Sequence, residues 1–232
     1  MDDTVNELGQ PVGWPVDVAP AEAPSSDPMV GQFCTLAILD PQAHGAELYD
    51  AYAEAADDGD WTYLPYGPFS DADDFDSFIS RSASQDDPLF FAVVDHNGRC
   101  SGLASYLRIN AYAASIEVGH IHFSRRLQQT PAATEAMYLM MARAFEGGYR
   151  RYEWKCDALN ALSRSAAARL GFGYEGTFRQ ATHYKGRNRD TAWFGITDAQ
   201  WPALRAEFER WLAPENFDAD GTQLTSLRCR QP

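Results

Sequence analysis

Hydrophobic and polar positions divide this chain into short strands and amphipathic helices. Apolar residues at helical spacing predict helices that begin near residues 41, 70, 132, 160 and 198. A strand, a helix and a strand in sequence imply a parallel crossover, whereas three strands joined by short turns indicate an antiparallel meander. We therefore expect a mixed α/β (α+β) domain. Runs rich in β-branched and aromatic residues predict its strands at 32–39, 89–94, 100–109, 115–123, 150–156, 174–185 and 190–197.

The two ends of the chain lack this periodicity. Residues 1–30 contain five prolines, so we expect an extended arm there, followed by one domain over 31–213 and a tail over 214–232. No run of about 18 apolar residues occurs, and the acidic start has no signal-peptide layout. The four cysteines are too widely spaced for a zinc pattern. These features predict a cytoplasmic protein with no membrane association.

Charge is distributed unevenly along the sequence. The net charge is −14, which argues against binding nucleic acid. Residues 1–100 hold 20 of the 33 acidic residues but only two of the 19 basic residues, Arg81 and Arg99. The acidic half serves either as a solubilising surface or as an attraction for a cationic substrate.

Residues 115–134 combine a strand, a polar turn and a helix start. The first N–H groups of a helix have no partner inside it, and the helix dipole is positive there. Arg125 and Arg126 add formal charge beside this end. The segment therefore predicts a docking place for a phosphorylated ligand.

Three titratable residues lie on the strand of this segment. Strict alternation would place Glu117, Gly119, Ile121 and Phe123 on one face, and Val118, His120 and His122 on the other. Glu117 is either a salt-bridged residue or a base that positions an amine. His120 and His122 line the site, act as a base through water, or bind a metal with a third ligand such as Asp157. With no clear third ligand, we expect no metal.

Further motifs resemble the GNAT superfamily of N-acetyltransferases. Residues 128–133 (Q-Q-T-P-A-A) are similar to its phosphate-loop signature, although Pro131 replaces a glycine and removes one N–H donor. Residues 160–163 (N-A-L-S), with Leu170-Gly171-Phe172, match a second motif. Residues 177–194 resemble the branch of ribosomal-protein N-terminal acetyltransferases. The resemblance implies a three-layer fold around a mostly antiparallel seven-stranded sheet, with a V-shaped splay between strands four and five, at 115–123 and 150–156.

The resemblance also implies roles for particular residues. It implies acetyl-CoA as cosubstrate and catalytic roles for Glu117, His120, Asn160 and Ser163, although Asn160 also suits a helix cap. Cys156 is either a buried structural thiol or an acetyl carrier, and the aromatic stretch 61–69 is either core or a substrate wall. Trp61, Tyr63, Tyr66 and Glu117 would contact the acceptor. Residues expected at acetyl-CoA are Ile121, His122, Phe123, Arg125, Arg126, Gln128, Gln129, Thr130, Ala132, Ala133, Thr134, Asn160 and Ser163.

The leading functional hypothesis is therefore an acetyl-CoA-dependent N-acetyltransferase. It would transfer the acetyl group by direct attack of a primary amine, from a small molecule, an amino acid or a peptide N-terminus. Two alternatives stay open, namely a non-catalytic acyl-CoA sensor and a metal hydrolase built on His120 and His122. We expect a monomer or a homodimer.

Overall fold

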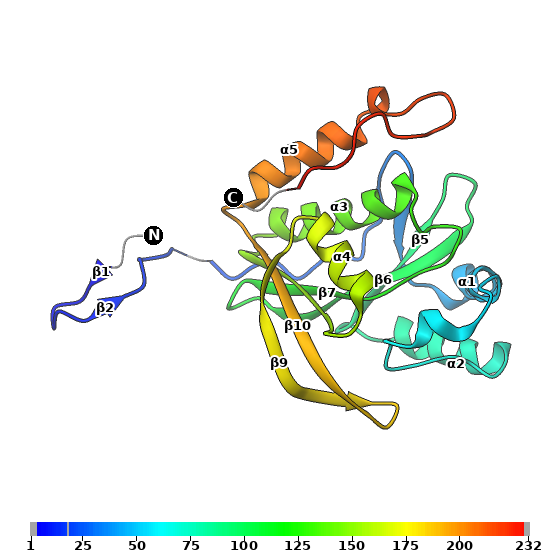
Figure 1. Cartoon of the computed structure of the whole chain (residues 1–232), viewed down its shortest axis with the longest axis horizontal. Coiled ribbons are helices and arrows are strands. Elements are labelled where there is room, and N and C mark those ends of the chain that lie inside the picture. The colour runs from blue at the N-terminus through cyan, green and yellow to red at the C-terminus, as the bar shows by residue number, and fades with distance from the viewer. Residues whose placement is uncertain (1–3, 18, 230–232) are drawn as a thin grey trace.

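The computed structural model describes residues 4–17 and 19–229, and its centre is an eight-stranded sheet (Figure 1). The predicted mixed, mostly antiparallel sheet is confirmed, because only β7 and β8 run parallel. It has one strand more than expected, because the two-residue β3 pairs with β4 at one edge. In spatial order the strands are β3 (Met29–Val30), β4 (Thr35–Ile38), β5 (Leu89–Val94), β6 (Cys100–Asn110), β7 (Ser115–Phe123), β8 (Arg151–Asp157), β10 (Arg187–Thr197) and β9 (Gly173–Tyr184).

Five α-helices in the described part of the chain flank the sheet, and polar caps fix where several of them begin. Asp40 accepts hydrogen bonds from the N–H groups of Gln42 and Ala43, and the side chain of Asp71 caps the next helix. Thr130 and Asn160 cap the two helices after the central strands. The helices are α1 (Pro41–Ala53), α2 (Ala72–Ala83), α3 (Pro131–Glu146), α4 (Ala161–Arg169) and α5 (Trp201–Leu212). No helix in the described ranges is long and apolar enough to cross a membrane.

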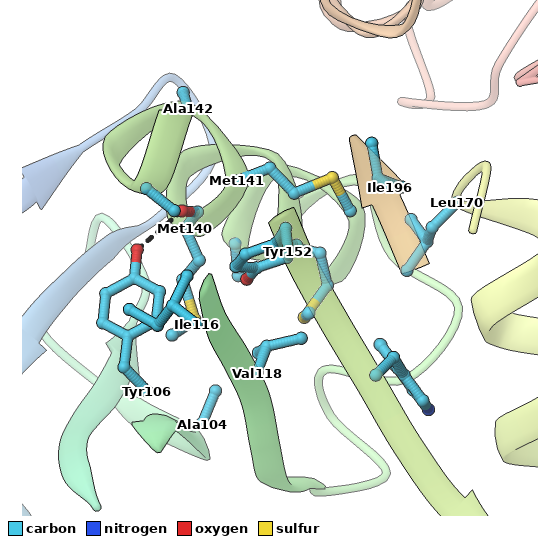
Figure 2. Close-up of a cluster of buried hydrophobic side chains, with 14 of the residues drawn as sticks. Ala104, Tyr106, Ile116, Val118, Met140, Met141, Ala142, Tyr152, Leu170 and Ile196 are labelled. Atoms are coloured by element: carbon cyan, nitrogen blue, oxygen red, sulfur yellow. Dashed lines mark hydrogen bonds between the residues drawn. The ribbon is translucent and has the colours of Figure 1, made fainter. Parts of the chain in front are cut away.

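One core lies between the sheet and α3 (Figure 2). Ile116 and Val118 of β7 and Tyr152 of β8 face Met140 there, and each of these side chains is at least 99% buried. Burying an aliphatic side chain of this size contributes on the order of 1.5–3 kcal/mol. The hydroxyl of Tyr106 donates a 2.6 Å hydrogen bond to the carbonyl of Met140, so the core also satisfies this polar group.

A second core covers the opposite side, under α1 and α2. Leu48 of α1 and Phe75 and Ile79 of α2 pack against Phe90 of β5 in this cluster. The short 3-10 helix η1 (Asp58–Trp61) and the aromatic stretch that follows it complete the layer. The sheet is therefore covered on both faces, as in a three-layer fold.

The terminal segments carry more structure than expected from sequence. The arm contains a small hairpin of β1 (Thr4–Val5) and β2 (Pro11–Val12), which projects from the body in Figure 1. In the tail, η2 (Pro214–Asn216) precedes a segment that bonds back to α5. Trp211 donates to Gln223, for example. The arm was expected to lack folded elements, and pairing that joins Thr4 to Val12 is not visible from local periodicity.

One buried carboxylate ties the arm end to α3. Glu135 accepts hydrogen bonds from the N–H groups of Gln32, Phe33 and Cys34 at 2.6–2.9 Å. A side chain at Gly31 would collide with this carboxylate, so the turn needs a glycine there. Nothing in the local pattern around Glu135 singles it out, because its partners lie about 100 positions earlier.

Candidate active site

The centre of the sheet opens where β7 and β8 part. Their parallel register runs from Ser115–Arg151 to Val118–Trp154 and then ends, although β7 continues to Phe123 and β8 to Asp157. This is the splay that was predicted between these two strands. Beyond Val118, β7 has no β8 partner, although the carbonyl groups of Gly119, His122 and Phe123 accept hydrogen bonds from side chains.

A bulge in β7 changes which side chains face this opening. His120 has a positive φ of 50°, and the pairing of β7 with β6 shifts at this position. Gly119 pairs with Ser105 and His122 pairs with Leu103, so one extra residue of β7 lies between the two pairs. Side-chain alternation therefore breaks at His120.

The bulge makes the predicted division of faces wrong. Glu117, His120 and His122 lie on one face, on the side of α1 and α2, because His120 contacts Phe90 and His122 pairs with Leu103. By contrast, the side chains of Ile121 and Phe123 pack against the α3 core. The two histidines thus share a face with Glu117, which strict alternation cannot produce.

Glu117 lies at the point where the strands part, and it is 3% exposed. Its Oε2 accepts from Arg108 Nη1 at 2.7 Å and from Lys155 Nζ at 2.8 Å, so the salt-bridged interpretation of the sequence is confirmed. Burial raises the pKa of Glu117, whereas Lys155 and Arg108 act in the opposite direction. The other oxygen, Oε1, has no hydrogen-bond partner within the described part of the chain. It remains available to accept a proton.

Lys155 joins several groups on this face. Its Nζ also bonds Glu153 Oε2 at 2.7 Å and lies 3.7 Å from the ring centre of Trp193. Glu153 is held further by Arg151. The Lys155 side chain is 7% exposed, so this is a buried network in which each charge has a partner.

Both histidines are neutral at neutral pH. Burial, with the charges of Arg108 and Arg189, lowers the pKa of His120 to about 4. Burial lowers the pKa of His122 to about 3, and its Nδ1 has no hydrogen-bond partner in the described ranges. Residues 4–17 and 19–229 contain no group of three or more His, Cys, Asp or Glu placed to hold a metal ion. The suggested third ligand, Asp157, accepts instead from the hydroxyl of Tyr184 at 2.8 Å.

The aromatic stretch 61–69 packs in the core at one end and contacts the loop after β8 at the other. Trp61 is buried against Tyr52 and His122. Tyr66 stacks over His120 with ring centres 5.6 Å apart. The hydroxyl of Tyr63 donates to the carbonyl of Leu159, in the loop after β8, at 3.3 Å. The stretch therefore reaches from the α1–α2 layer to the far side of the splay.

The polar turn after β7 is held by acids from the preceding elements. Arg125 pairs with Asp60 at 3.1 Å, and Arg126 pairs with Glu54 at 2.8 Å. The expected free positive charge beside the helix is therefore partly neutralised. Moreover, the start of α3 is not uncapped, because Thr130 Oγ1 accepts from the N–H of Ala133 at 3.2 Å.

Other residues expected at the cosubstrate also have structural contacts. Gln128 donates to the carbonyl of Phe123 at 2.7 Å, and Gln129 adopts a positive φ of 62° in the same turn. Thr134 is buried and accepts from Arg169 at 3.1 Å. Ala132 packs against the α3 core. These contacts shape the turn around the helix start.

The Asn160–Ser163 motif sits at the start of α4, on the other side of the splay. Asn160 Oδ1 accepts from the N–H of Ser163 at 3.0 Å, so its role as a helix cap is confirmed. Ser163 Oγ accepts from the indole N–H of Trp154 at 3.0 Å. Burial raises the pKa of Cys156, with the hydroxyl of Ser163 acting in the opposite direction. Cys156 is thus a buried thiol, which suits a structural residue better than an acetyl carrier.

Sequence reasoning missed the basic partners of this site. Arg108 and Lys155 were not singled out, nor was Trp193. Alternation within 150–156 does separate Glu153 and Lys155 from the apolar Tyr152 and Trp154. That signal could have indicated a polar face on β8, but not its partners on other strands.

The geometry defines an acyltransferase fold with a split central sheet, and comparison with known proteins agrees. Residues 41–173 match the family described as the acetyltransferase (GNAT) domain. The chain belongs to this family of acetyltransferases. No match was found among curated proteins.

Solved structures give the same result. A GCN5-related N-acetyltransferase from Brucella melitensis is 42% identical, with a TM-score of 0.87, and the match covers 90% of this chain and 95% of that one. A probable acetyltransferase (GNAT family) from Chromobacterium violaceum is 38% identical, with a TM-score of 0.77 over 83% and 99% of the two chains. The ribosomal alpha-N-protein acetyltransferase RimL, at 17% identity and a TM-score of 0.63 over 78% and 99%, shares the fold.

Proposed function

We propose that this protein transfers the acetyl group of acetyl-CoA to a primary amine by direct attack. The observation that carries this proposal is the position of Glu117, a buried carboxylate with one free oxygen at the point where β7 and β8 part. A carboxylate there attracts an ammonium group and accepts its proton. Membership of the acetyltransferase family supports the same chemistry.

Acetyl-CoA is proposed to lie across the splay, with its pyrophosphate at the turn that precedes α3. Ser124 supports this placement, because it is 2% exposed and its Oγ has no hydrogen-bond partner in the described ranges. The unpaired edge of β7, from Gly119 to Phe123, would hold the extended arm of the cosubstrate. Its thioester would then lie between Glu117 and Ser163.

The proposed reaction needs three proton transfers. The ammonium loses a proton to Glu117 Oε1, directly or through a water, and the neutral nitrogen attacks the thioester carbonyl. A C–N bond forms, the nitrogen gives up its second proton, the C–S bond breaks, and the CoA thiolate takes up a proton, so one proton is released overall. Ser163 lies on the other arm of the splay and is our candidate for the donor, while His120 is neutral and lines the acceptor side.

The charge of the acceptor and the location of the protein are also proposed. The acidic first half of the chain would favour cationic amines over nucleic acids, and the protein would work in the cytoplasm as a monomer or homodimer. A non-catalytic acyl-CoA sensor is the second candidate, because the polar contacts of Asn160 and Ser163 within the chain are compatible with binding alone.

The test is release of free thiol from acetyl-CoA against a panel of primary amines. Wild-type protein should release thiol only when an amine is present. Glu117→Gln should lower kcat/KM roughly tenfold to a thousandfold, with acetyl-CoA affinity unchanged in calorimetry. A thermal melt of the variant confirms that it is folded. Tight binding of acetyl-CoA with no turnover on any amine would instead support the sensor.

A further inference from the structure

Arg189 lacks the carboxylate partner that the cations around Glu117 and Glu153 have. Arg108, Lys155 and Arg151 each bond a glutamate on the sheet. Arg189 makes no ion pair in the described ranges, and its buried Nε has no hydrogen-bond partner. An arginine that is half-buried without an acceptor leaves strong donors unused.

Strand register places Arg189 on the same face as Glu117. Trp193 pairs with Lys155, whose side chain bonds Glu117, and Arg189 lies four residues before Trp193 on β10. The pairing of β10 with β9 shifts between Arg189 and Thr191, but the extra residues belong to β9. Even spacing along β10 therefore keeps the side chains of Arg189 and Trp193 on one face. A second contact agrees, because Arg189 lies over the ring of Tyr184 at 5.7 Å. The hydroxyl of that tyrosine reaches Asp157 on β8.

Other donors at the same face are also unused. The hydroxyl of Tyr66 and the indole N–H of Trp193 are buried and have no partner among the described residues. Lys185, in the turn between β9 and β10, bonds only the carbonyl of Trp61, at 2.6 Å, and makes no ion pair in the described ranges. Tyr66 stacks over His120, and the charge of Arg189 reaches the same histidine. Unused donors therefore surround His120 from two sides.

The acidic side chains on this face have other partners and form no ion pair with Arg189 or Lys185 in the described ranges. Glu117 and Glu153 are engaged by Lys155, and Asp157 accepts from Tyr184. A ligand that brought only a positive charge would leave Arg189 and Lys185 without an anion. A ligand with an ammonium and a carboxylate would instead complement both the free oxygen of Glu117 and the free guanidinium of Arg189.

We propose that Arg189 binds a carboxylate of the acceptor, so that the acceptor is a small zwitterion such as a free amino acid. This rests on the proposed function and narrows its substrate class. The planar fork of an arginine matches the two oxygens of a carboxylate. Tyr66 and Trp193 supply further donors around it, while the amine faces Glu117. A peptide N-terminus has an amide at the position of this carboxylate and fits less well.

The test compares free amino acids with their α-amides and with the corresponding decarboxylated amines. Thiol release from acetyl-CoA should favour the amino acid roughly tenfold to a hundredfold in kcat/KM, as expected for a charged hydrogen bond. Arg189→Gln should remove this preference and Arg189→Lys should keep part of it. Arg179→Gln is the matched control, because Arg179 is exposed on the neighbouring strand, and it should keep the full preference.

Two results would overturn the inference. In one, wild-type protein uses amides or simple amines as well as it uses the acids. In the other, the preference for acids survives in Arg189→Gln. If no amine is acetylated, the proposed function fails. Calorimetry with the amino acid panel and CoA-bound protein then tests separately whether Arg189 binds a carboxylate. Binding that Arg189→Gln abolishes and Arg179→Gln retains would support the carboxylate site, and no binding by wild-type protein would overturn it.

Discussion

Lys155 Nζ lies 2.8 Å from Glu117 Oε2, so an ion pair joins the two strands that part at the centre of the sheet. The last paired residues are Val118 and Trp154, and Lys155 is the next residue on β8. The pair therefore links the two arms of the splay at its narrow end. It positions Glu117 and opposes the rise in its pKa that burial causes.

Lys155→Met should show how much this pair stabilises the fold. The variant removes the cation that Glu117 and Glu153 share, although Arg108 and Arg151 still bond them, so the free energy of unfolding should fall by roughly 3 kcal/mol in urea titrations. Adding Glu117→Gln removes one of the two carboxylates that the lysine bonds. The double variant should therefore lose less than the sum of the two single changes. Additive losses would mean that the two residues do not interact energetically.

The buried histidines should make stability depend on pH. Their native pKa values, about 4 for His120 and about 3 for His122, lie below the usual value of 6.5. The free energy of unfolding is not reduced by these histidines above pH 6.5. It decreases as the pH falls from 6.5 towards 4, because the unfolded chain then binds protons that the native state does not. Each histidine contributes a slope of about 1.4 kcal/mol per pH unit.

His122→Phe tests this assignment, because phenylalanine keeps an aromatic ring beside Tyr52 and removes only the unpaired nitrogens. Chemical unfolding between pH 5 and 6.5 should show a shallower slope than in wild-type protein. The exposed His183→Gln should show the wild-type slope. An unchanged slope in His122→Phe would mean that His122 does not resist protonation in the native state.

Ser163→Ala should affect turnover more than binding. The hydroxyl contacts Trp154 and Cys156, and it is our candidate proton donor to the departing thiolate. We expect a loss of turnover on the order of tenfold to a thousandfold, with the affinity for CoA nearly unchanged. Ser165→Ala, an exposed serine on the same helix, is the control. Full activity of Ser163→Ala would require another donor, such as a water molecule.

Arg126→Ala, combined with Gln128→Ala, should weaken binding of CoA. The two side chains belong to the turn before α3, where the pyrophosphate is proposed to lie. Calorimetry should show a lower affinity that also depends less on salt, since one charged contact is gone. Arg99→Ala removes an exposed arginine elsewhere and should change neither quantity. Equal affinity and an equal salt slope in the double variant would place the pyrophosphate elsewhere.

Local patterns predicted most of the fold. Strand and helix periodicity placed the central elements, and the crossover between β7 and β8 followed from their order. The N-cap Asn160 was visible as a residue type. These features depend on neighbours in the sequence, so a single sequence contains them.

The site was harder to predict, because its geometry depends on contacts between distant residues. The bulge at His120 changes which face of the sheet the following side chains lie on. The sequence around it contains no signal that marks the position of the bulge. Likewise, the partners of Glu117 come from β6 and β8, and only the strand register brings Arg108 and Lys155 to one oxygen. Glu117 was recognised as a candidate, but its environment was not.

The carboxylate of Glu135 has a consequence for how this chain folds. It binds backbone groups 101–103 positions earlier, at the turn between β3 and β4. Closing so long a loop costs conformational entropy, which the hydrogen bonds of Glu135 offset only after they have formed. We therefore expect this contact to form late in folding. Until then the second turn of α3 carries a carboxylate without these three partners. The beginning of α3, beside the proposed pyrophosphate position, would therefore reach its final order only when residues 32–34 are in place.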